Sequence, residues 1–212
     1  MSEDSPAIDA LVERLKAGDA DALAELFSYY RAMLRRMIEL RIDPRLAGRV
    51  SASDVLQDVY LDAAQRVRHF AAKSEMPFIV WLRLVAGQRL VDLHRQHLGA
   101  QRRDARAEVS LPAGGSPSAS SAGMAAELAG HLTSPSHAAA RAETRAALEA
   151  ALEKLDPIDR EVLALRHFEE LSNRETATIL GIEPSAASKR YLRALERLKI
   201  VAATIPGLVD GA

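Results

Sequence analysis

Apolar side chains recur every three or four residues along most of this chain, which is the spacing of amphipathic α-helices. The pattern predicts four helices before residue 107, beginning near Ile8, Asp19, Ser51 and Pro77. It predicts four more after residue 136, beginning near His137, Asp156, Asn173 and Pro184. Alanine and leucine abound and aromatic residues are only 4%, which also favours helices. We therefore expect an all-α protein.

A short helix, a glycine turn and a longer basic helix are predicted within residues 171–199. Ser172 and Glu175 stand three residues apart in the order of a capping box, which places the start of the short helix. Gly181 can adopt the backbone conformation that ends a helix, and Pro184 suits the first position of the next one. This order is typical of a helix-turn-helix, whose second helix lies in a DNA major groove. An ordinary helical hairpin with a solvated basic face has the same pattern.

The longer helix of this pair carries polar and basic residues opposite its apolar stripe. In a helix-turn-helix, such residues divide into those that contact base edges and those that bind phosphates. We predict that the base-reading residues are Ser185, Ser188 and Lys189. We predict that the residues contacting mostly phosphates are Arg190, Arg193 and Arg197.

Composition changes abruptly between residues 107 and 136, where Ala, Gly, Ser and Pro predominate. Such a segment cannot bury enough apolar surface to offset the entropy lost on ordering, so it predicts a flexible linker. The chain then divides into a helical domain at 1–106, the linker at 107–136 and a second helical domain at 137–212. We expect no fixed geometry between the domains of the free protein, and protease sites within the linker.

Composition also excludes several classes of function. The net charge of −1 argues against an independent, non-specific DNA-binding protein. Cysteine is absent, so there is no disulfide, thiol nucleophile or cysteine–zinc site. The acidic start and the lack of a long apolar run predict a cytoplasmic protein without membrane insertion. No phosphate loop, GxSxG or HExxH motif occurs, so we expect neither an enzyme nor a cofactor or metal.

The predicted helix that follows Ser51 carries Asp54, Asp58 and Asp62 opposite its buried side. These carboxylates either form a solvated face or belong to a docking surface for a basic or polar partner. In the second case Leu61 would be its apolar centre and Gln57 a hydrogen-bonding group. Arginines gather instead on the next helix, which favours one face for nucleic acid and another for a protein partner.

Three segments, in order and at matching spacing, resemble a known family: ASDVLQDVYLDA, WLRLVAGQRLVDLHRQ and LDPIDREVLALRHFEELSNRETATILGI. The chain resembles a bacterial RNA polymerase sigma factor of the sigma-70 superfamily, extracytoplasmic-function class, which keeps the domains numbered two and four. Residues 20–103 resemble domain two and residues 138–199 resemble domain four. The resemblance implies a promoter-specificity subunit that binds the clamp and flap regions of core RNA polymerase, recognises promoter DNA and promotes strand opening. It leaves open whether an anti-sigma factor holds the protein silent.

The resemblance also assigns roles to particular residues. The face presented to the polymerase clamp helices would comprise Asp54, Gln57, Asp58 and Leu61. A loop at 71–76 would hold one flipped base of the minus-ten element, and the contacts to that element would be made by Lys73, Ser74, Glu75, Gln88, Asp92 and Arg95. The helix from Pro184 would read the minus-thirty-five element. The family often has asparagine at the position of Gln88, and a threonine–valine pair at Ala186 and Ala187.

Two other functions fit parts of the pattern. A non-sigma helix-turn-helix regulator with a helical sensory domain would share the basic helix but would not need the acidic docking face. A helical adaptor that binds only protein would need neither a basic reading helix nor DNA.

Overall fold

The computed structural model describes residues 6–46, 48–73, 75–98, 116–132 and 138–203, and every regular element in these ranges is a helix. This confirms the expected all-α fold. The elements are α1 (Pro6–Lys16), α2 (Ala20–Arg41), the 3₁₀ turn η1 (Pro44–Leu46), α3 (Ala52–Lys73), α4 (Phe78–Leu98), α5 (Ser121–Leu132), α6 (Ala138–Glu153), α7 (Pro157–Leu163), the π-helical turn η3 (Ala164–Phe168), α8 (Asn173–Leu180) and α9 (Pro184–Ala202).

Short polar side chains determine where several helices begin. The Asp19 carboxylate accepts the backbone N–H of Asp21 at 2.9 Å, which caps α2. Ser51 Oγ accepts the N–H of Asp54 at 3.1 Å at the start of α3. The predicted start of α7 is confirmed, because Asp156 caps it and Pro157 occupies its first turn.

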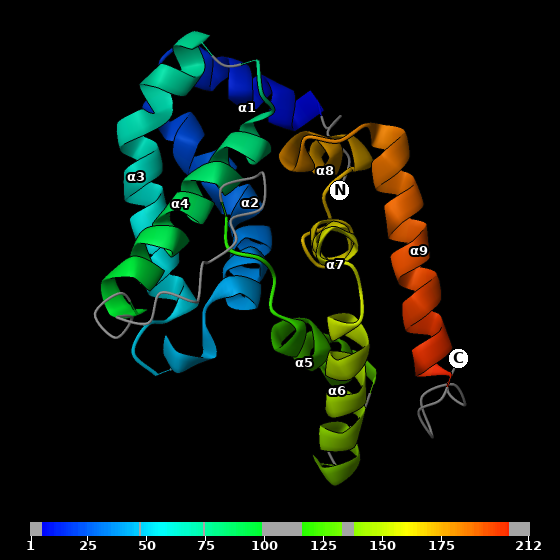
Figure 1. Ribbon diagram of the computed structural model, residues 1–212. Helices are drawn as coiled ribbons and strands as arrows, with labels where there is room; N and C mark the ends of the chain where they lie inside the picture. Colours follow the sequence, from blue (N-terminus) through cyan, green and yellow to red (C-terminus); the bar gives the residue numbers. More distant parts are fainter. Residues whose placement is uncertain (1–5, 47, 74, 99–115, 133–137, 204–212) are drawn as a thin grey trace.

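Helices α1 to α4 form the N-terminal half of the molecule, with α2, α3 and α4 packed together and α1 lying across one end (Figure 1). Its centre is made of buried aliphatic side chains that include Leu26, Leu34, Ile38, Leu82 and Leu90. Burying one such side chain contributes about 1.5–3 kcal/mol, so this core supplies much of the stability of the half.

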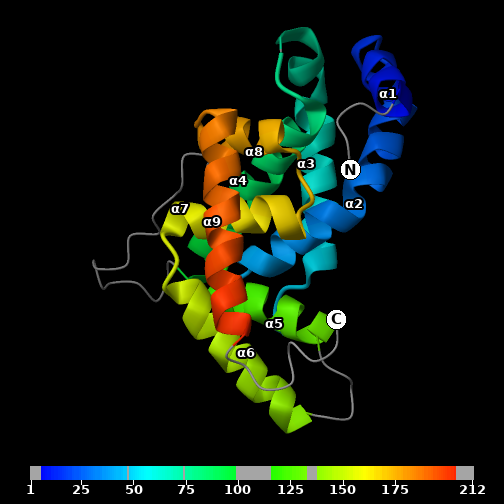
Figure 2. The ribbon, with the colours of Figure 1, turned by 90° about the vertical axis from the view of Figure 1, so that its right-hand side faces the viewer.

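Helices α6 to α9 form the C-terminal half. Leu148 and Leu152 of α6 pack with Leu163 of α7, Phe168 of η3 and Ala194 of α9. Helix α7 lies between the N-terminal half and α9, so that α9 forms the outer side of the molecule, remote from α3 (Figures 1 and 2).

The helix α5 lies within residues 107–136, for which the composition predicted a flexible linker. In this part the structure differs from the prediction. Met124 and Ala125 are buried, the N–H of Ser120 donates to Leu40 O at 2.8 Å, and α5 packs against α6 and the end of α2. Alanine and leucine are strong helix formers, and these tertiary contacts cannot be read from composition. Residues 107–115 and 133–136 of the predicted linker lie outside the described residues.

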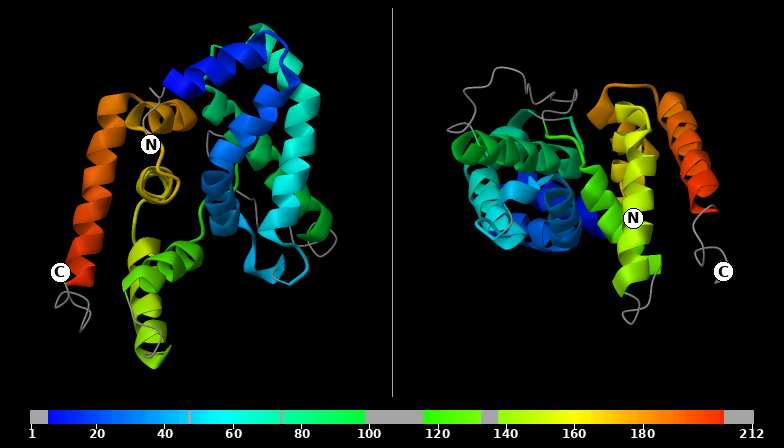
Figure 3. Two further views of the ribbon diagram at one scale, coloured as in Figure 1. Left: turned by 180° about the vertical axis from the view of Figure 1, so that it is seen from behind. Right: turned by 60° about the horizontal axis from the view of Figure 1, so that its bottom comes forward.

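The two halves are in direct contact, whereas we predicted no fixed geometry between them. Val162 and Leu165 share one buried cluster with Leu34 and Ile38 of α2, and Ile179 of α8 belongs to the same cluster. The views in Figure 3 show the C-terminal half lying along the N-terminal half. The sequence pattern predicted apolar faces on both sides but not that these faces cover each other.

A group of four charged side chains, which we call the buried ion cluster, lies within this contact. It consists of Arg41 of α2, Arg83 of α4, Glu161 of α7 and Glu169, which follows η3. Each half therefore contributes charges of one sign.

None of the helices in the described ranges combines the length and the apolar character needed to cross a bilayer.

Candidate nucleic-acid interface

The connection between α8 and α9 is fixed by a capping box and a glycine turn, both of which the sequence predicted, and by one hydrogen bond that it did not indicate. Ser172 N donates to Glu175 Oε2 at 2.6 Å, and Glu175 N donates to Ser172 Oγ at 3.1 Å, which completes the capping box. Gly181 adopts the left-handed conformation (φ 62°) that ends α8. Asn173 Nδ2 donates to Pro184 O at 2.8 Å and ties the start of α8 to the start of α9. The helix-turn-helix is thus held rigidly at its turn.

Helix α9 has an inner and an outer side. Ala187 and Ala194 are fully buried, and Tyr191 is half-buried with the Arg166 guanidinium 5.2 Å from its ring centre. The predicted base-reading residues Ser185, Ser188 and Lys189, and the predicted phosphate-binding Arg197, are exposed. These four side chains are accessible to a nucleic acid.

Two of the predicted phosphate-binding arginines have another partner. Arg190 Nη1 lies 2.7 Å from Asp159 Oδ1, and Arg193 Nη2 lies 3.4 Å from the same oxygen. The Asp159 side chain is 3% exposed, that of Arg190 29% and that of Arg193 53%. Arg190 therefore holds α9 on α7, whereas Arg193 keeps half of its surface open. Sequence reasoning assigned Asp159 only to the first turn of α7 and missed its contact with α9.

The predicted docking face on α3 is partly engaged within the molecule. Gln57 is exposed, and the Leu61 side chain is 52% exposed despite being apolar. Asp54 is exposed and its Oδ2 accepts Ser51 Oγ at 2.7 Å. Asp58 lies 2.5 Å from Arg89 Nη2 of α4, an ion pair that the sequence pattern did not indicate. Leu61 and Gln57 are thus the members most open to a partner.

A shallow groove of about 480 Å³ runs beside this face between α2 and α3. Gln57 and Asp54 line one side of it, and Phe27 and Tyr60, whose rings meet edge to face at 5.1 Å, contribute apolar surface. The exposed Leu61 and the groove together give α3 a surface of mixed character.

The predicted minus-ten residues lie in two places. Lys73 ends α3, so the predicted loop 71–76 is shorter by the three helical residues 71–73; the Lys73 side chain and Ser74 lie outside the described part of the structure. Glu75 is exposed in the loop, before α4 begins at Phe78. Gln88 is the eleventh residue of α4, about 15 Å along the helix axis from Phe78. The structure therefore does not bring Glu75 and Gln88 into one cluster.

The outer side of α4 does bring the other three residues together. Gln88, Asp92 and Arg95 are exposed at helical spacing, and Arg95 lies 4.0 Å from Asp92. Gln88 Oε1 accepts a hydrogen bond from Arg66 of α3. An amide, a carboxylate and a guanidinium on one accessible face supply both donors and acceptors for bases and phosphates.

Glu75 borders a groove of about 570 Å³ that the sequence did not indicate. Helix α1, the α3–α4 loop and α8 all border this groove, and its lining includes Glu75, Met76 and Pro77 of the loop and Arg174, Glu175 and Thr178 of α8. The two predicted DNA-binding regions are thus neighbours through α8.

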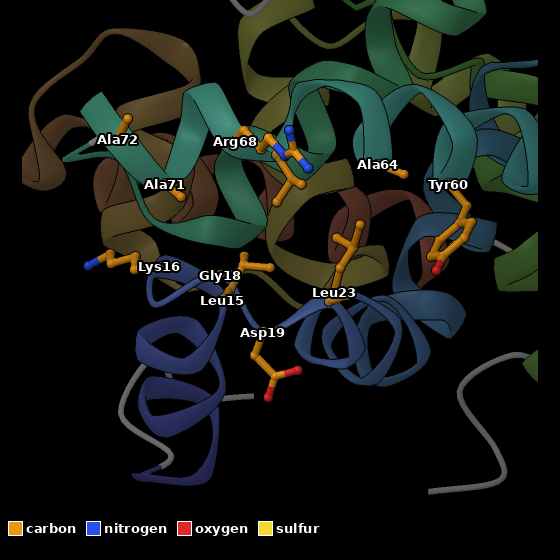
Figure 4. Close-up of a pocket in the computed structure, with 12 residues that line it drawn as sticks. Leu15, Lys16, Gly18, Asp19, Leu23, Tyr60, Ala64, Arg68, Ala71 and Ala72 are labelled. Atoms are coloured by element: carbon orange, nitrogen blue, oxygen red, sulfur yellow. The ribbon is translucent and has the colours of Figure 1, made fainter.

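A third groove, of about 540 Å³, lies between the α1–α2 turn and α3. Leu15, Leu23 and the small side chains Ala64, Ala71 and Ala72 line it (Figure 4). Ala71 and Ala72 belong to the segment 71–76 that was predicted to hold a flipped base, but both lie in the last turn of α3. Within the described ranges, no group of three or more His, Cys, Asp or Glu side chains is placed to hold a metal ion.

Comparison with known proteins identifies the family. The sequence profile of "Sigma-70, region 4" matches residues 145–198, which run from α6 to α9. The ECF RNA polymerase sigma factor SigD of Mycobacterium tuberculosis is 31% identical over 205 residues, covering 96% of this chain and 88% of SigD.

Two solved structures share the fold. The structure of CnrH in complex with the cytosolic domain of CnrY has a TM-score of 0.52 at 20% identity, covering 92% of this chain and 96% of that chain. The sigma factor RpoE of Bartonella quintana, in complex with the anti-sigma factor NepR, has a TM-score of 0.50 at 19% identity, covering 90% and 98%. Together with the exposed polar and basic side of α9, the extent of the match to SigD shows that this chain belongs to the ECF class of RNA polymerase sigma factors.

Proposed function

We propose that this chain binds core RNA polymerase, reads the minus-thirty-five element with α9, and stabilises unpaired minus-ten bases with the α3–α4 loop and α4. The observation that carries the proposal is the separation of two accessible faces. Ser185, Ser188 and Lys189 are exposed on one side of the molecule, and Gln57 and Leu61 are exposed on α3 at the other. One chain can therefore contact DNA and a protein partner at the same time.

The proposed mechanism uses binding energy and no bond chemistry. Residues near the N-terminus of α9 contact base edges in the major groove, and Lys189 donates to acceptors such as those of guanine. Downstream, extracting a base from the stack costs a few kcal/mol, which contacts to the extruded base offset. Glu75 and the polar side of α4 supply such contacts.

The partners proposed are core RNA polymerase, at its clamp and flap regions, and promoter DNA. The two solved relatives described above are complexes with CnrY and with the anti-sigma factor NepR. An anti-sigma factor is therefore a further candidate partner for this chain.

The docking face is tested by binding to core polymerase, measured by fluorescence anisotropy. Leu61→Ala and Gln57→Ala should weaken binding, because they remove the apolar centre and the accessible amide. The control is His69→Ala, an exposed residue of the same helix about two turns beyond Leu61. Equal affinities for wild type, Leu61→Ala and Gln57→Ala would exclude this face as the docking surface.

Base reading is tested with the polymerase holoenzyme on a promoter library. Lys189→Ala should change sequence preference upstream by about 1–3 kcal/mol at the contacted position. Lys199→Ala, at the far end of α9, should leave the preference unchanged. A wild-type chain that ignores core polymerase yet binds one duplex tightly would favour the helix-turn-helix regulator instead.

A further inference from the structure

Arg66 of α3 and Gln88 of α4 form a hydrogen-bonded pair on the accessible side of α4. Arg66 Nη1 donates to Gln88 Oε1, and both side chains are exposed. The two residues lie 22 positions apart in the sequence, on helices that pack against each other. The pair therefore links α3 to α4 and is also open to a nucleic acid.

The chemistry of arginine determines how the Gln88 amide is oriented. A guanidinium has only N–H donors, so the atom of the amide that binds it must be the carbonyl oxygen. The amide nitrogen, with its two hydrogens, then lies away from this contact. Within the described ranges, no protein group accepts a hydrogen bond from Gln88 Nε2. Both hydrogens are thus available to a ligand.

The next residue of α4 does not compete with Arg66 for the amide oxygen. Arg89 Nη2 lies 2.5 Å from Asp58 Oδ2, and Arg89 Nε donates to the same oxygen at 3.2 Å. Arg89 is therefore engaged with α3 at a different residue. Among the described residues, Arg66 is the donor that holds the Gln88 amide in its orientation.

Such a pair can distinguish bases by one exocyclic group. Guanine and thymine carry a carbonyl oxygen there, O6 or O4, which accepts hydrogen bonds, whereas adenine and cytosine carry an amino group, which donates. A glutamine with a free oxygen can bind adenine with both ends of its amide. Here the positive charge of Arg66 lies beside that oxygen and repels a second donor, so the pair offers donors alone.

We propose that Arg66 is a positioning residue: it orients the Gln88 amide so that the chain prefers a base with a carbonyl group, guanine or thymine, at one position of the minus-ten element. The inference rests on the proposed function, because it requires α4 to contact that element. Since both side chains are exposed, the preference over adenine and cytosine should be about fivefold, the lower end of what one base contact provides.

The test reverses the charge that orients the amide. Wild-type and Arg66→Glu chains are assembled with core polymerase, and promoter opening is measured on a library randomised across the minus-ten element. The introduced carboxylate has only acceptors, so it should bind the amide nitrogen and turn the oxygen of Gln88 outward. The preference at one position should then change from guanine or thymine to adenine or cytosine, with the other positions unchanged.

Two further substitutions at the same position separate orientation from charge. Arg66→Lys keeps a donor and should retain the wild-type preference. Arg66→Met removes the donor but keeps an apolar side chain of similar reach, so the four bases should become nearly equivalent at this position. Circular dichroism checks that every variant keeps its helices.

The matched control is Arg68→Glu, which makes the same change of charge on the same helix. Arg68 is exposed and borders the groove beside the α1–α2 turn, because two residues correspond to about half a turn of α3. This variant should weaken binding to all sequences alike and leave the preference unchanged.

A double substitution tests whether Arg66 acts through Gln88. Gln88→Ala should abolish the preference for guanine or thymine. In that background Arg66→Glu should cause no further change in preference, because the amide that it would turn is absent.

The outcomes distinguish this inference from the proposed function. If wild type shows a minus-ten preference that Arg66→Glu leaves unchanged, the inference is overturned and the proposed function stands. An equal effect of Arg66→Glu with and without Gln88 would also overturn it, because Arg66 would then contact DNA directly. A wild-type holoenzyme without any preference at the minus-ten element would contradict the proposed function, and this inference with it.

Discussion

Two arginine–carboxylate groups in this molecule look alike in sequence and differ in surroundings. In the buried ion cluster, Arg41 and Arg83 are fully enclosed with two glutamates. At the contact of α7 with α9, Arg190 and Arg193 share Asp159 but remain partly in water. A partly exposed guanidinium can exchange a carboxylate for a phosphate at small cost, whereas an enclosed one cannot. The comparison distinguishes the buried Arg41 and Arg83, which join the two halves, from the partly exposed arginines of α9, which a nucleic acid can reach.

The largest difference should appear between two arginines on the same helix. Arg83→Ala leaves two buried carboxylates short of partners and should lower the free energy of unfolding by about 3–5 kcal/mol. Arg89→Ala removes a half-buried pair with Asp58 and should cost at most about 1 kcal/mol. Urea unfolding of both variants measures the difference. Similar losses for the two would mean that burial does not set the strength of the cluster.

Acid should weaken the cluster through Glu161. Burial raises the pKa of this carboxyl, but the charges of Arg41 and Arg83 outweigh burial, so the pKa falls below its ordinary value of 4.5. Because the folded state binds the proton less readily than the unfolded state, this contribution is complete above pH 4.5. It is lost as the pH falls from 4.5 through the pKa of the folded state. Unfolding free energies of wild type and Glu161→Gln against pH should therefore converge in acid.

Replacing Arg190 should mainly lower stability, whereas replacing Arg193 should mainly change promoter binding. Arg190→Ala leaves the enclosed Asp159 without its nearest donor and should cost about 1.5–3 kcal/mol of stability. Arg193→Ala should change stability little but reduce the salt dependence of promoter binding by about one ion. Thermal unfolding and salt titration of the holoenzyme distinguish them. A loss of salt dependence with Arg190→Ala alone would reverse the two assignments.

The smallest effect is expected at Glu170, beside the cluster. This residue has a left-handed backbone (φ 57°), and its carboxylate lies 2.5 Å from Arg36 of α2. Glu170→Gly relieves a strain of about 1–2 kcal/mol but loses an exposed ion pair worth at most about 1 kcal/mol, so the net change should be near zero or slightly stabilising. Repeating the substitution in an Arg36→Ala background should reveal the strain alone, as a larger gain in stability.

The sequence was sufficient for local structure because local structure depends on near neighbours. The capping box at Ser172 and the left-handed Gly181 lie within a few residues of the helix ends they define. The apolar stripe of α9 likewise followed from helical spacing. Ser185 and Lys189 are exposed because they do not belong to that stripe.

The sequence was insufficient where the partner of a side chain is remote. Arg83 lies 78 positions from Glu161, and nothing in the spacing of charges distinguishes it from an arginine that binds DNA. The same holds for Asp58, which pairs with Arg89, 31 positions away. Helix α5 was missed for a related reason, because the contacts that bury it are made with Leu40 and α6, which are remote in sequence.

Residues 116–120 pass between the two halves and are bonded to both, so access of a protease to this segment depends on whether the halves are in contact. The N–H of Ala119 is bonded to Glu161 in the C-terminal half and the N–H of Ser120 to Leu40 in the N-terminal half, so cleavage beside these two residues requires those bonds to be broken. When closing is fast compared with cutting, the rate of cleavage is proportional to the population of the opened form. The rate of cleavage beside residues 119 and 120 therefore measures the fraction of molecules whose halves are separated, and a ligand that keeps the halves together would slow this cleavage.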